Sequence, residues 1–140
     1  METQLIKNFD VQNIEINADP ELVFDFVAEP RNIPKWAKAF TKADEHSAVL
    51  VTPNGELNIK MTLNTSKTYG VIDTVMTMPD GSIGEAYSRV TPNNNGKSAI
   101  FTFVLMAPPV PLEELEGTLE AQKLQLAEEL QLLKQILENK

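Results

Sequence analysis

The longest hydrophobic pattern of this chain lies in its C-terminal part, after a proline-rich bend at 107–111. Apolar residues recur there at helical spacing, which places their side chains on one face of an α-helix. The main row consists of Leu112, Leu115, Leu119, Leu126, Leu130, Leu133 and Leu137. A second row, Leu124, Leu132 and Ile136, makes the apolar stripe wide. The pattern predicts one uninterrupted helix from Leu112 to Lys140, long and apolar enough to cover a sheet.

Two short helices are predicted near the N-terminus, after a first strand at 7–17. Asp19 followed by Pro20 is a typical N-cap with proline at the first helical position, and Pro30 ends this helix. A second short helix begins at 32–34 and carries Trp36. A short edge strand is expected to follow at 39–45.

Turn signals divide the middle of the chain at regular intervals. Asn54-Gly55 and Asp80-Gly81 are pairs that favour two-residue hairpin turns, and the run 93–96 favours a longer connection. The implied strands cover 46–52, 57–64, 69–78, 83–91 and 98–106. Successive strands joined in this way predict an antiparallel meander and, with the helices, an α+β fold.

Several short motifs accompany this order of elements. They are Asp19-Pro20 with Val23-Phe24, Pro34-Lys35-Trp36, Met78-Pro79-Asp80-Gly81-Ser82, Arg89-Val90 with Pro92-Asn93, and Phe101-Thr102-Phe103 followed by Pro108-Pro109. With them the chain resembles the helix-grip START-like, or SRPBCC, superfamily, and within it an uncharacterised bacterial subgroup of the polyketide cyclase/dehydrase branch. The resemblance implies a curved antiparallel sheet of about six to seven strands wrapped around the long C-terminal helix. It covers nearly all of the chain, so a single domain spanning 1–140 is expected.

The predicted turns also decide which side chains share a face of the sheet, because side chains alternate along a strand and paired residues lie on the same side. The first hairpin pairs Leu50 with Ile59. A three-residue turn at 65–67, chosen because it keeps the apolar residues together, pairs Ile59 with Asp73. A one-residue slip in that turn would invert the strands that follow. The face expected to lie under the long helix carries Leu50, Leu57, Ile59, Met61, Leu63, Val71, Val75, Ala86, Val90, Phe101, Phe103 and Leu105.

Four polar residues, His46, Tyr69, Asp73 and Ser88, fall on this predicted inner face. A buried carboxylate is costly unless it is paired or hydrogen-bonded, so Asp73 either bonds Ser88 and ordered water or serves as a ligand anchor or acid–base group. His46 is either an exposed histidine at the rim or a proton acceptor. Tyr69 either is half buried or directs its hydroxyl into a cavity. Asp73, His46 and Tyr69 are therefore the candidate catalytic residues.

Small residues at Gly84, Ala86, Ser88 and Ala99 leave space on the same predicted face. Trp36 either fills part of the core or, with Phe40 beside it, forms an aromatic wall of a cavity. The candidate ligand-binding residues are Trp36, Leu57, Ile59, Met61, Tyr69, Val71, Asp73, Val75, Ala86, Ser88, Phe101 and Phe103.

Composition narrows the possible functions. The net charge is −8, without a cluster of basic residues, so a nucleic acid partner is not expected. The chain has no cysteine and a single histidine, and it lacks a phosphate-binding loop, so we expect neither a metal site nor a cofactor. No apolar run has the length of a membrane span, and the N-terminus does not resemble a signal peptide, so a cytoplasmic location is expected.

Three functions remain open. The first is binding of a small hydrophobic or amphipathic ligand between the sheet and the long helix. The second, implied by the cyclase resemblance, is a cofactor-free enzyme acting on a polyketide-like or aromatic substrate, in which Asp73 or His46 removes a proton and Tyr69 or Ser88 stabilises the enolate. The third is a homodimeric interaction module. A second leucine row left exposed would favour the dimer, whereas a buried one would leave a monomer.

Overall fold

The computed structural model describes residues 8–52, 55–107 and 119–140. Within these ranges the strands are β1 (Phe9–Ile16), β2 (Phe40–Ala43), β3 (Ser47–Thr52), β4 (Gly55–Ser66), β5 (Val71–Thr77), β6 (Ile83–Asn93) and β7 (Ser98–Met106). The helices are α1 (Pro20–Ala28), α2 (Ile33–Trp36) and α4 (Leu119–Glu138), with short 3₁₀ turns η1 (Pro30–Asn32) and η2 (Asn94–Gly96). The order of these elements agrees with the sequence prediction.

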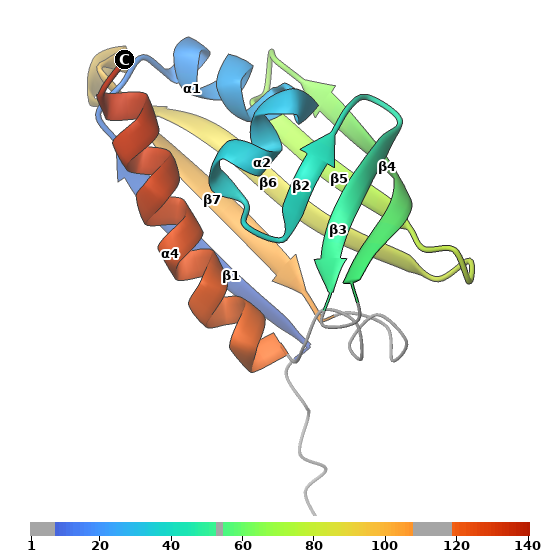
Figure 1. The fold of residues 1–140 in the computed structure, drawn as a ribbon. Helices are drawn as coiled ribbons and strands as arrows, with labels where there is room; N and C mark the ends of the chain where they lie inside the picture. The colour runs from blue at the N-terminus through green and yellow to red at the C-terminus, as the bar shows by residue number, and fades with distance from the viewer. Residues whose placement is uncertain (1–7, 53–54, 108–118) are drawn as a thin grey trace, which may run out of the picture.

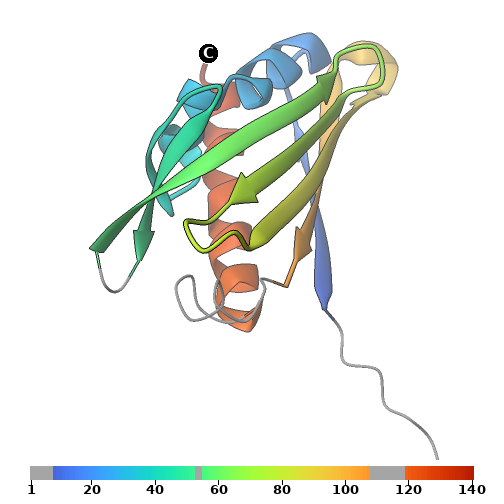
Figure 2. The same cartoon turned by 90° about the vertical axis from the view of Figure 1, so that its right-hand side faces the viewer.

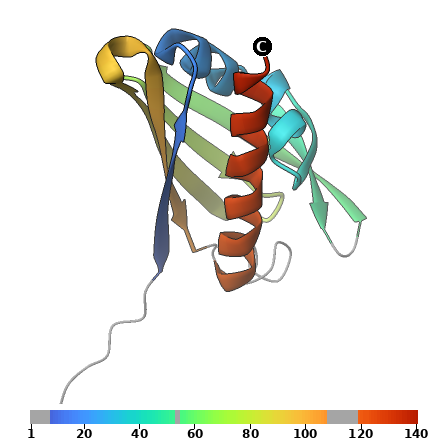
Figure 3. The same cartoon turned by 90° about the vertical axis from the view of Figure 1, so that its left-hand side faces the viewer.

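The seven strands form one antiparallel sheet in the order β1-β7-β6-β5-β4-β3-β2. The sheet curls around α4, which runs beside β1 and along the concave face (Figure 1; Figure 3). Seen from its convex side, the sheet has α4 behind it (Figure 2). The predicted α+β fold, a curved antiparallel sheet gripping a C-terminal helix, is confirmed.

The short helices form where the sequence predicts them. The Asp19 carboxylate accepts a hydrogen bond of 2.8 Å from the Glu21 N–H and caps α1. Pro20 opens this helix, which packs against β6 and β7. Helix α2 ends in Trp36, which is buried and leads the chain directly toward the edge strand β2.

Two of the hairpins differ from the predicted register by two residues, which does not change the faces. Leu50 pairs with Leu57 rather than Ile59. Ser88 pairs with Phe103, whereas the four-residue loop expected at 93–96 would place it opposite Phe101. Because the side-chain period of a strand is two, the same residues still point inward. Met61 and Phe101 are buried on that face, as predicted.

The register predicted for β4 and β5 is wrong. Strand β4 continues to Ser66, which pairs with Val71, so that four residues rather than three form the turn. Gly70 ends this turn with φ +71°, and a Cβ there would lie 2.1 Å from the Val90 carbonyl oxygen. Only glycine fits such a close approach with positive φ. The shift is odd, so β5 turns over and Ile72 and Thr74, instead of their odd-numbered neighbours, face α4.

A second odd shift in the next hairpin restores the predicted faces. Thr77 pairs with Ile83, and the Met78 N–H donates to the Ser82 carbonyl, so this turn holds one residue more than the two-residue turn expected. The two errors cancel beyond β5. Ala86 and Ser88 therefore point inward and are buried, as the sequence predicts.

Helix α4 is described from Leu119 onward, so Leu112 and Leu115 lie outside the described residues. Its main row is buried at Leu126, Leu130, Leu133 and Leu137, the last two almost completely. In the second row, Leu132 and Ile136 are partly buried against the core, whereas Leu124 is 74% exposed. Most of the second row thus widens the covered face of the sheet.

Candidate functional site

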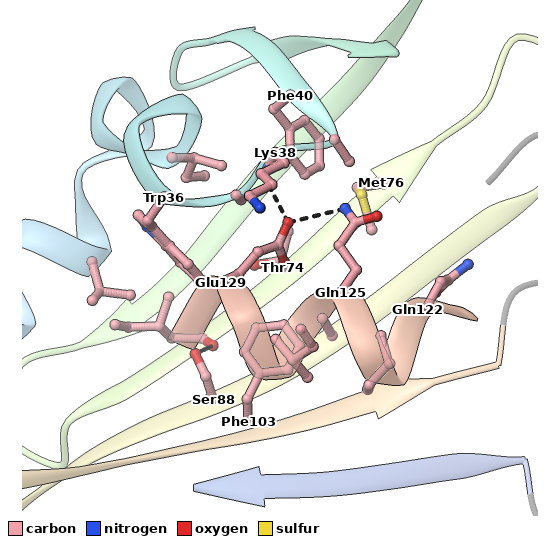
Figure 4. A pocket seen from close by; sticks show the side chains of 18 of the residues that line it. Trp36, Lys38, Phe40, Thr74, Met76, Ser88, Phe103, Gln122, Gln125 and Glu129 are labelled. Carbon is pink, nitrogen blue, oxygen red and sulfur yellow. Dashed lines mark hydrogen bonds between the residues drawn. The ribbon is translucent and has the colours of Figure 1, made fainter. Parts of the chain in front are cut away.

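A cavity of about 330 Å³ lies between the concave face of the sheet and the N-terminal half of α4. Its third wall is the segment that joins α2 to β2 (Figure 4). This volume is within the range of small-molecule sites, which begins at about 300 Å³. Of the four small residues expected to leave space, Ala86 and Ser88 line this cavity, whereas Gly84 and Ala99 do not.

Most of the wall is apolar. The sheet contributes Phe40, Val51, Met61, Leu63, Ile72, Met76, Ala86, Phe101, Phe103 and Leu105, and the remaining apolar lining comes from Val27, Ile33, Trp36, Ala37, Ala39 and Leu126. Phe101 stands between two other rings, with centroids 6.2 Å from both Trp36 and Phe103 in edge-to-face geometry. These contacts hold the aromatic wall in a defined arrangement.

Trp36 combines the two roles considered from the sequence. It is buried in the core cluster and also lines the cavity. Its indole Nε1 is buried and has no hydrogen-bond partner within the described part of the chain. An unpartnered buried donor is uncommon in proteins, so the position of this ring is set by apolar packing rather than by a polar contact.

Polar groups line the cavity at Thr74, Ser88, Lys38, Gln122, Gln125 and Glu129. The Ser88 hydroxyl donates a 2.8 Å hydrogen bond to the Ile72 carbonyl oxygen, its cross-strand neighbour. The predicted bond from Asp73 to Ser88 is therefore replaced by a bond to the backbone. The Thr74 hydroxyl makes no hydrogen bond to any residue in the described ranges, so it is a polar group that a cavity occupant can reach.

Glu129 is the buried charged residue of this site, with 8% of its surface exposed. Its Oε2 accepts hydrogen bonds from the Lys38 backbone N–H at 2.7 Å and from the Gln125 amide at 3.0 Å (Figure 4). Burial raises the pKa of this carboxyl above its ordinary value, although the two hydrogen bonds oppose the shift. A carboxyl group thus lies at the junction of α4 and the segment before β2.

All three predicted catalytic candidates lie outside the cavity. Asp73 is on the outer face of the sheet, opposite Tyr87, because of the inverted register of β5. Tyr69 belongs to the turn before β5 and is 68% exposed. His46 is exposed, and its backbone N–H donates to Asp44 at 2.9 Å. The structure does not bring these three residues together.

The predicted ligand-binding set divides into two groups. Trp36, Met61, Ala86, Ser88, Phe101 and Phe103 line the cavity. Val71 and Val75 lie on the outer face together with Asp73, so their predicted inward orientation is wrong, as is that of Tyr69. Leu57 and Ile59 face inward, as predicted, but lie beside the cavity rather than on its wall.

The sequence reasoning missed Glu129, although the pattern contained a signal. This residue follows Leu126 by three positions and precedes Leu133 by four, so it belongs to the apolar face of the helix. A glutamate at such a position is either buried with its carboxylate or keeps that part of the helix from packing closely on the sheet. Thr74, Gln125 and Lys38 were missed because their places depend on the β5 register and on the tertiary contact with α4.

No set of three or more His, Cys, Asp or Glu side chains among the described residues has the grouping that a metal ion would need. None of the described helices is long and apolar enough to cross a membrane.

The curled sheet, the two short helices and the covering C-terminal helix define the helix-grip fold of START-like proteins. No family model matches the chain and no curated protein matches it, but solved structures do. XoxI from Bacillus cereus is 13% identical, with a TM-score of 0.67 over 94% of this chain and 96% of its own. A START superfamily protein from Mycobacterium smegmatis is 14% identical, with a TM-score of 0.66 over 95% and 99%.

The ZhuI aromatase/cyclase from Streptomyces sp. R1128 is also similar, at 10% identity and a TM-score of 0.68 over 93% of both chains. At such low identities the similarity establishes the fold alone. The resemblance to START-like proteins and polyketide cyclases, first noted in short motifs, is confirmed for the fold.

Proposed function

We propose that this protein binds a small apolar or amphipathic molecule in the cavity between the sheet and α4. The observation that carries the proposal is the cavity itself, about 330 Å³ of space lined in part by buried residues of the hydrophobic core. Protein interiors normally leave few voids larger than a water molecule. A space of this size with apolar walls therefore favours a binding role.

The lining suits such a ligand. Burial of apolar surface contributes roughly 25 cal/mol per Å², so the aliphatic and aromatic walls would supply most of the affinity. Thr74, Gln125 and Glu129 would orient the polar part of the molecule. The similar structures include a START superfamily protein and an aromatase/cyclase, and both classes of function are compatible with a bound organic molecule.

The alternatives receive less support. Asp73, His46 and Tyr69 lie away from the cavity, so a cyclase-type enzyme would need other acid–base groups. For a homodimer through the second leucine row, Leu124 alone of that row is widely exposed. A single exposed leucine is normal on a protein surface and does not indicate an interface.

Filling the cavity tests the proposal. Octan-1-ol is titrated into the protein, and binding is followed by NMR chemical shifts. In Ala86→Phe the larger ring occupies the cavity, so we expect affinity to fall at least about tenfold, equivalent to ~1.4 kcal/mol. Thr62→Phe, on the exposed outer face of β4, is the matched control and should bind as the wild type does. Equal affinity of a folded Ala86→Phe variant would contradict the proposal.

A further inference from the structure

Glu129 has hydrogen-bonding capacity that the protein leaves unused. Both of its hydrogen bonds from described residues, from the Lys38 N–H at 2.7 Å and from the Gln125 amide at 3.0 Å, go to Oε2. Within the described residues, Oε1 accepts no hydrogen bond and the carboxylate has no ion pair. Because this side chain lines the cavity, a bound molecule can reach it.

The charged groups around Glu129 do not form an ion pair with it and offset its burial only in part: the Lys38 ammonium lowers its pKa, and the Glu128 carboxylate raises it. Lys38, on the segment before β2, has its ammonium 3.3 Å from the carboxylate of Glu128 and is more than half exposed. Glu128, on α4 itself, has the same charge as its neighbour. The remaining polar lining residues, Thr74, Ser88 and the two glutamines, are neutral. A carboxylate that is removed from water without a direct ion pair is costly, and burial accordingly raises the pKa of Glu129.

We propose that the ligand of this cavity is an amphipathic molecule with a protonated amine, whose ammonium group binds Oε1 of Glu129 while its apolar part lies against the sheet. The inference rests on the proposed binding function and names the chemical class of the ligand. An ammonium group would both donate to the unused oxygen and supply the missing positive charge.

Two further observations favour a cation over a neutral or anionic group. The net charge of −8 attracts cations toward the protein and repels anions. The rings of Trp36, Phe40 and Phe103 line the same cavity, and their π faces attract ammonium groups (Figure 4). An alcohol could donate to Oε1 but would leave the charge of the carboxylate unpaired.

Three probes with the same chain, octylamine, octan-1-ol and octanoate, test this inference at neutral pH by isothermal titration calorimetry. We expect octylamine to bind roughly tenfold more tightly than octan-1-ol, and octanoate to bind most weakly. In Glu129→Gln the preference for the amine should disappear, so that the ratio of the octylamine affinity to the octan-1-ol affinity falls to about one. Glu128→Gln is the matched control, because it removes the same charge from the exposed neighbouring residue and should keep the preference.

The outcomes separate the two proposals. If octan-1-ol binds but octylamine binds no more tightly, or if the preference survives Glu129→Gln, the amine inference fails and the binding function stands. If no probe binds, both fail.

A pH series on the wild type gives a second readout that needs no Glu129 variant. Octylamine stays protonated as the pH falls, so the preference should decline while Glu129 gains its proton. The same series on Glu128→Gln removes the contribution of the neighbouring carboxylate. A preference unchanged down to about pH 3, below the ordinary pKa of glutamate, would overturn the inference.

Discussion

The two halves of α4 use similar residues for different purposes. In the C-terminal half, Leu133 and Leu137 are at most 1% exposed and pack in the core with Ile16, Val23 and Ala99. From the N-terminal half to the middle of the helix, Leu126 and Glu129 face the cavity. The helix is an anchor at one end and the wall of a binding site at the other, although its sequence shows one continuous stripe.

Two glutamates of α4, Glu138 at its C-terminal end and Glu129 at its middle, differ in the same way. Glu138 accepts hydrogen bonds from the Asn17 N–H at 2.7 Å and from the Lys134 ammonium at 2.5 Å, and these contacts lower its pKa. Lys134 also donates to the Glu15 carbonyl at 2.8 Å and ties the helix to β1. Glu129 makes no ion pair among the described residues, and burial raises its pKa although the more distant Lys38 ammonium opposes the shift. The Glu138 carboxylate, in an ion pair, thus stabilises the C-terminal end of α4 against β1, whereas the Glu129 carboxylate, without an ion pair, faces the cavity.

The largest expected difference between the halves concerns leucine truncation. Leu133→Ala should lower the free energy of unfolding by about 3 kcal/mol, because it opens a new void in a filled region. Leu126→Ala should cost only about 1 to 2 kcal/mol, because one side of Leu126 already borders empty space. Urea denaturation monitored by circular dichroism measures both. Equal losses would show that the two ends are packed alike.

Substitutions that enlarge a small residue should also cost more stability in the filled core than beside the cavity. Ala99 is fully buried in the core and pairs with Ile16 of β1. Ala99→Leu should therefore destabilise the protein by about 1 to 3 kcal/mol through overpacking. Ala86 borders the cavity, and Ala86→Leu should change stability by less than about 0.5 kcal/mol while it reduces octan-1-ol binding. Thermal melting and the NMR titration provide the two readouts. A large loss of stability in Ala86→Leu would mean that the cavity is not available to a side chain.

The pH dependence of stability should have opposite signs at the two glutamates. The lowered pKa of Glu138 stabilises the fold above the ordinary carboxyl value of about 4.3, and this stabilisation is lost as the pH falls through the folded pKa. The raised pKa of Glu129 stabilises the fold below that value, and its contribution is lost as the pH rises through the folded pKa.

Urea midpoints between about pH 3 and pH 8 measure these signs. Relative to the wild type, Glu138→Gln should become less stable as the pH rises, and Glu129→Gln should become more stable. Slopes of the same sign would contradict the assigned pKa directions.

The smallest effect is expected at Leu124, which is mostly exposed on α4. Leu124→Gln should change the free energy of unfolding by less than about 0.5 kcal/mol. Analytical ultracentrifugation of both proteins should show the same sedimentation coefficient. If the wild type sediments as a dimer and the variant as a monomer, this leucine is part of an interface and the dimer alternative regains support.

Local signals in the sequence were sufficient for the elements and for most of the covered face. The N-cap at Asp19, the prolines and the Asn-Gly and Asp-Gly pairs act over a few residues, so they predicted where helices and strands begin and end. Hydrophobic periodicity predicted the buried row of α4. Each of these signals can be recognised within one segment of the chain, because it depends on local backbone geometry or on the spacing of apolar residues.

The site was predicted only in part, because it depends on turns and on contacts between distant segments. The conformation of Gly70 is set by its approach to Val90, which lies on β6, and this contact decided that Ile72 and Thr74 rather than Asp73 face α4. The contact between the Lys38 N–H and Glu129 joins segments 91 residues apart. The sequence alone determined the elements and the helix-grip arrangement, since their signals are local. The tertiary structure decided which polar groups face the cavity, because a one-residue change in a turn exchanges the two faces of a strand.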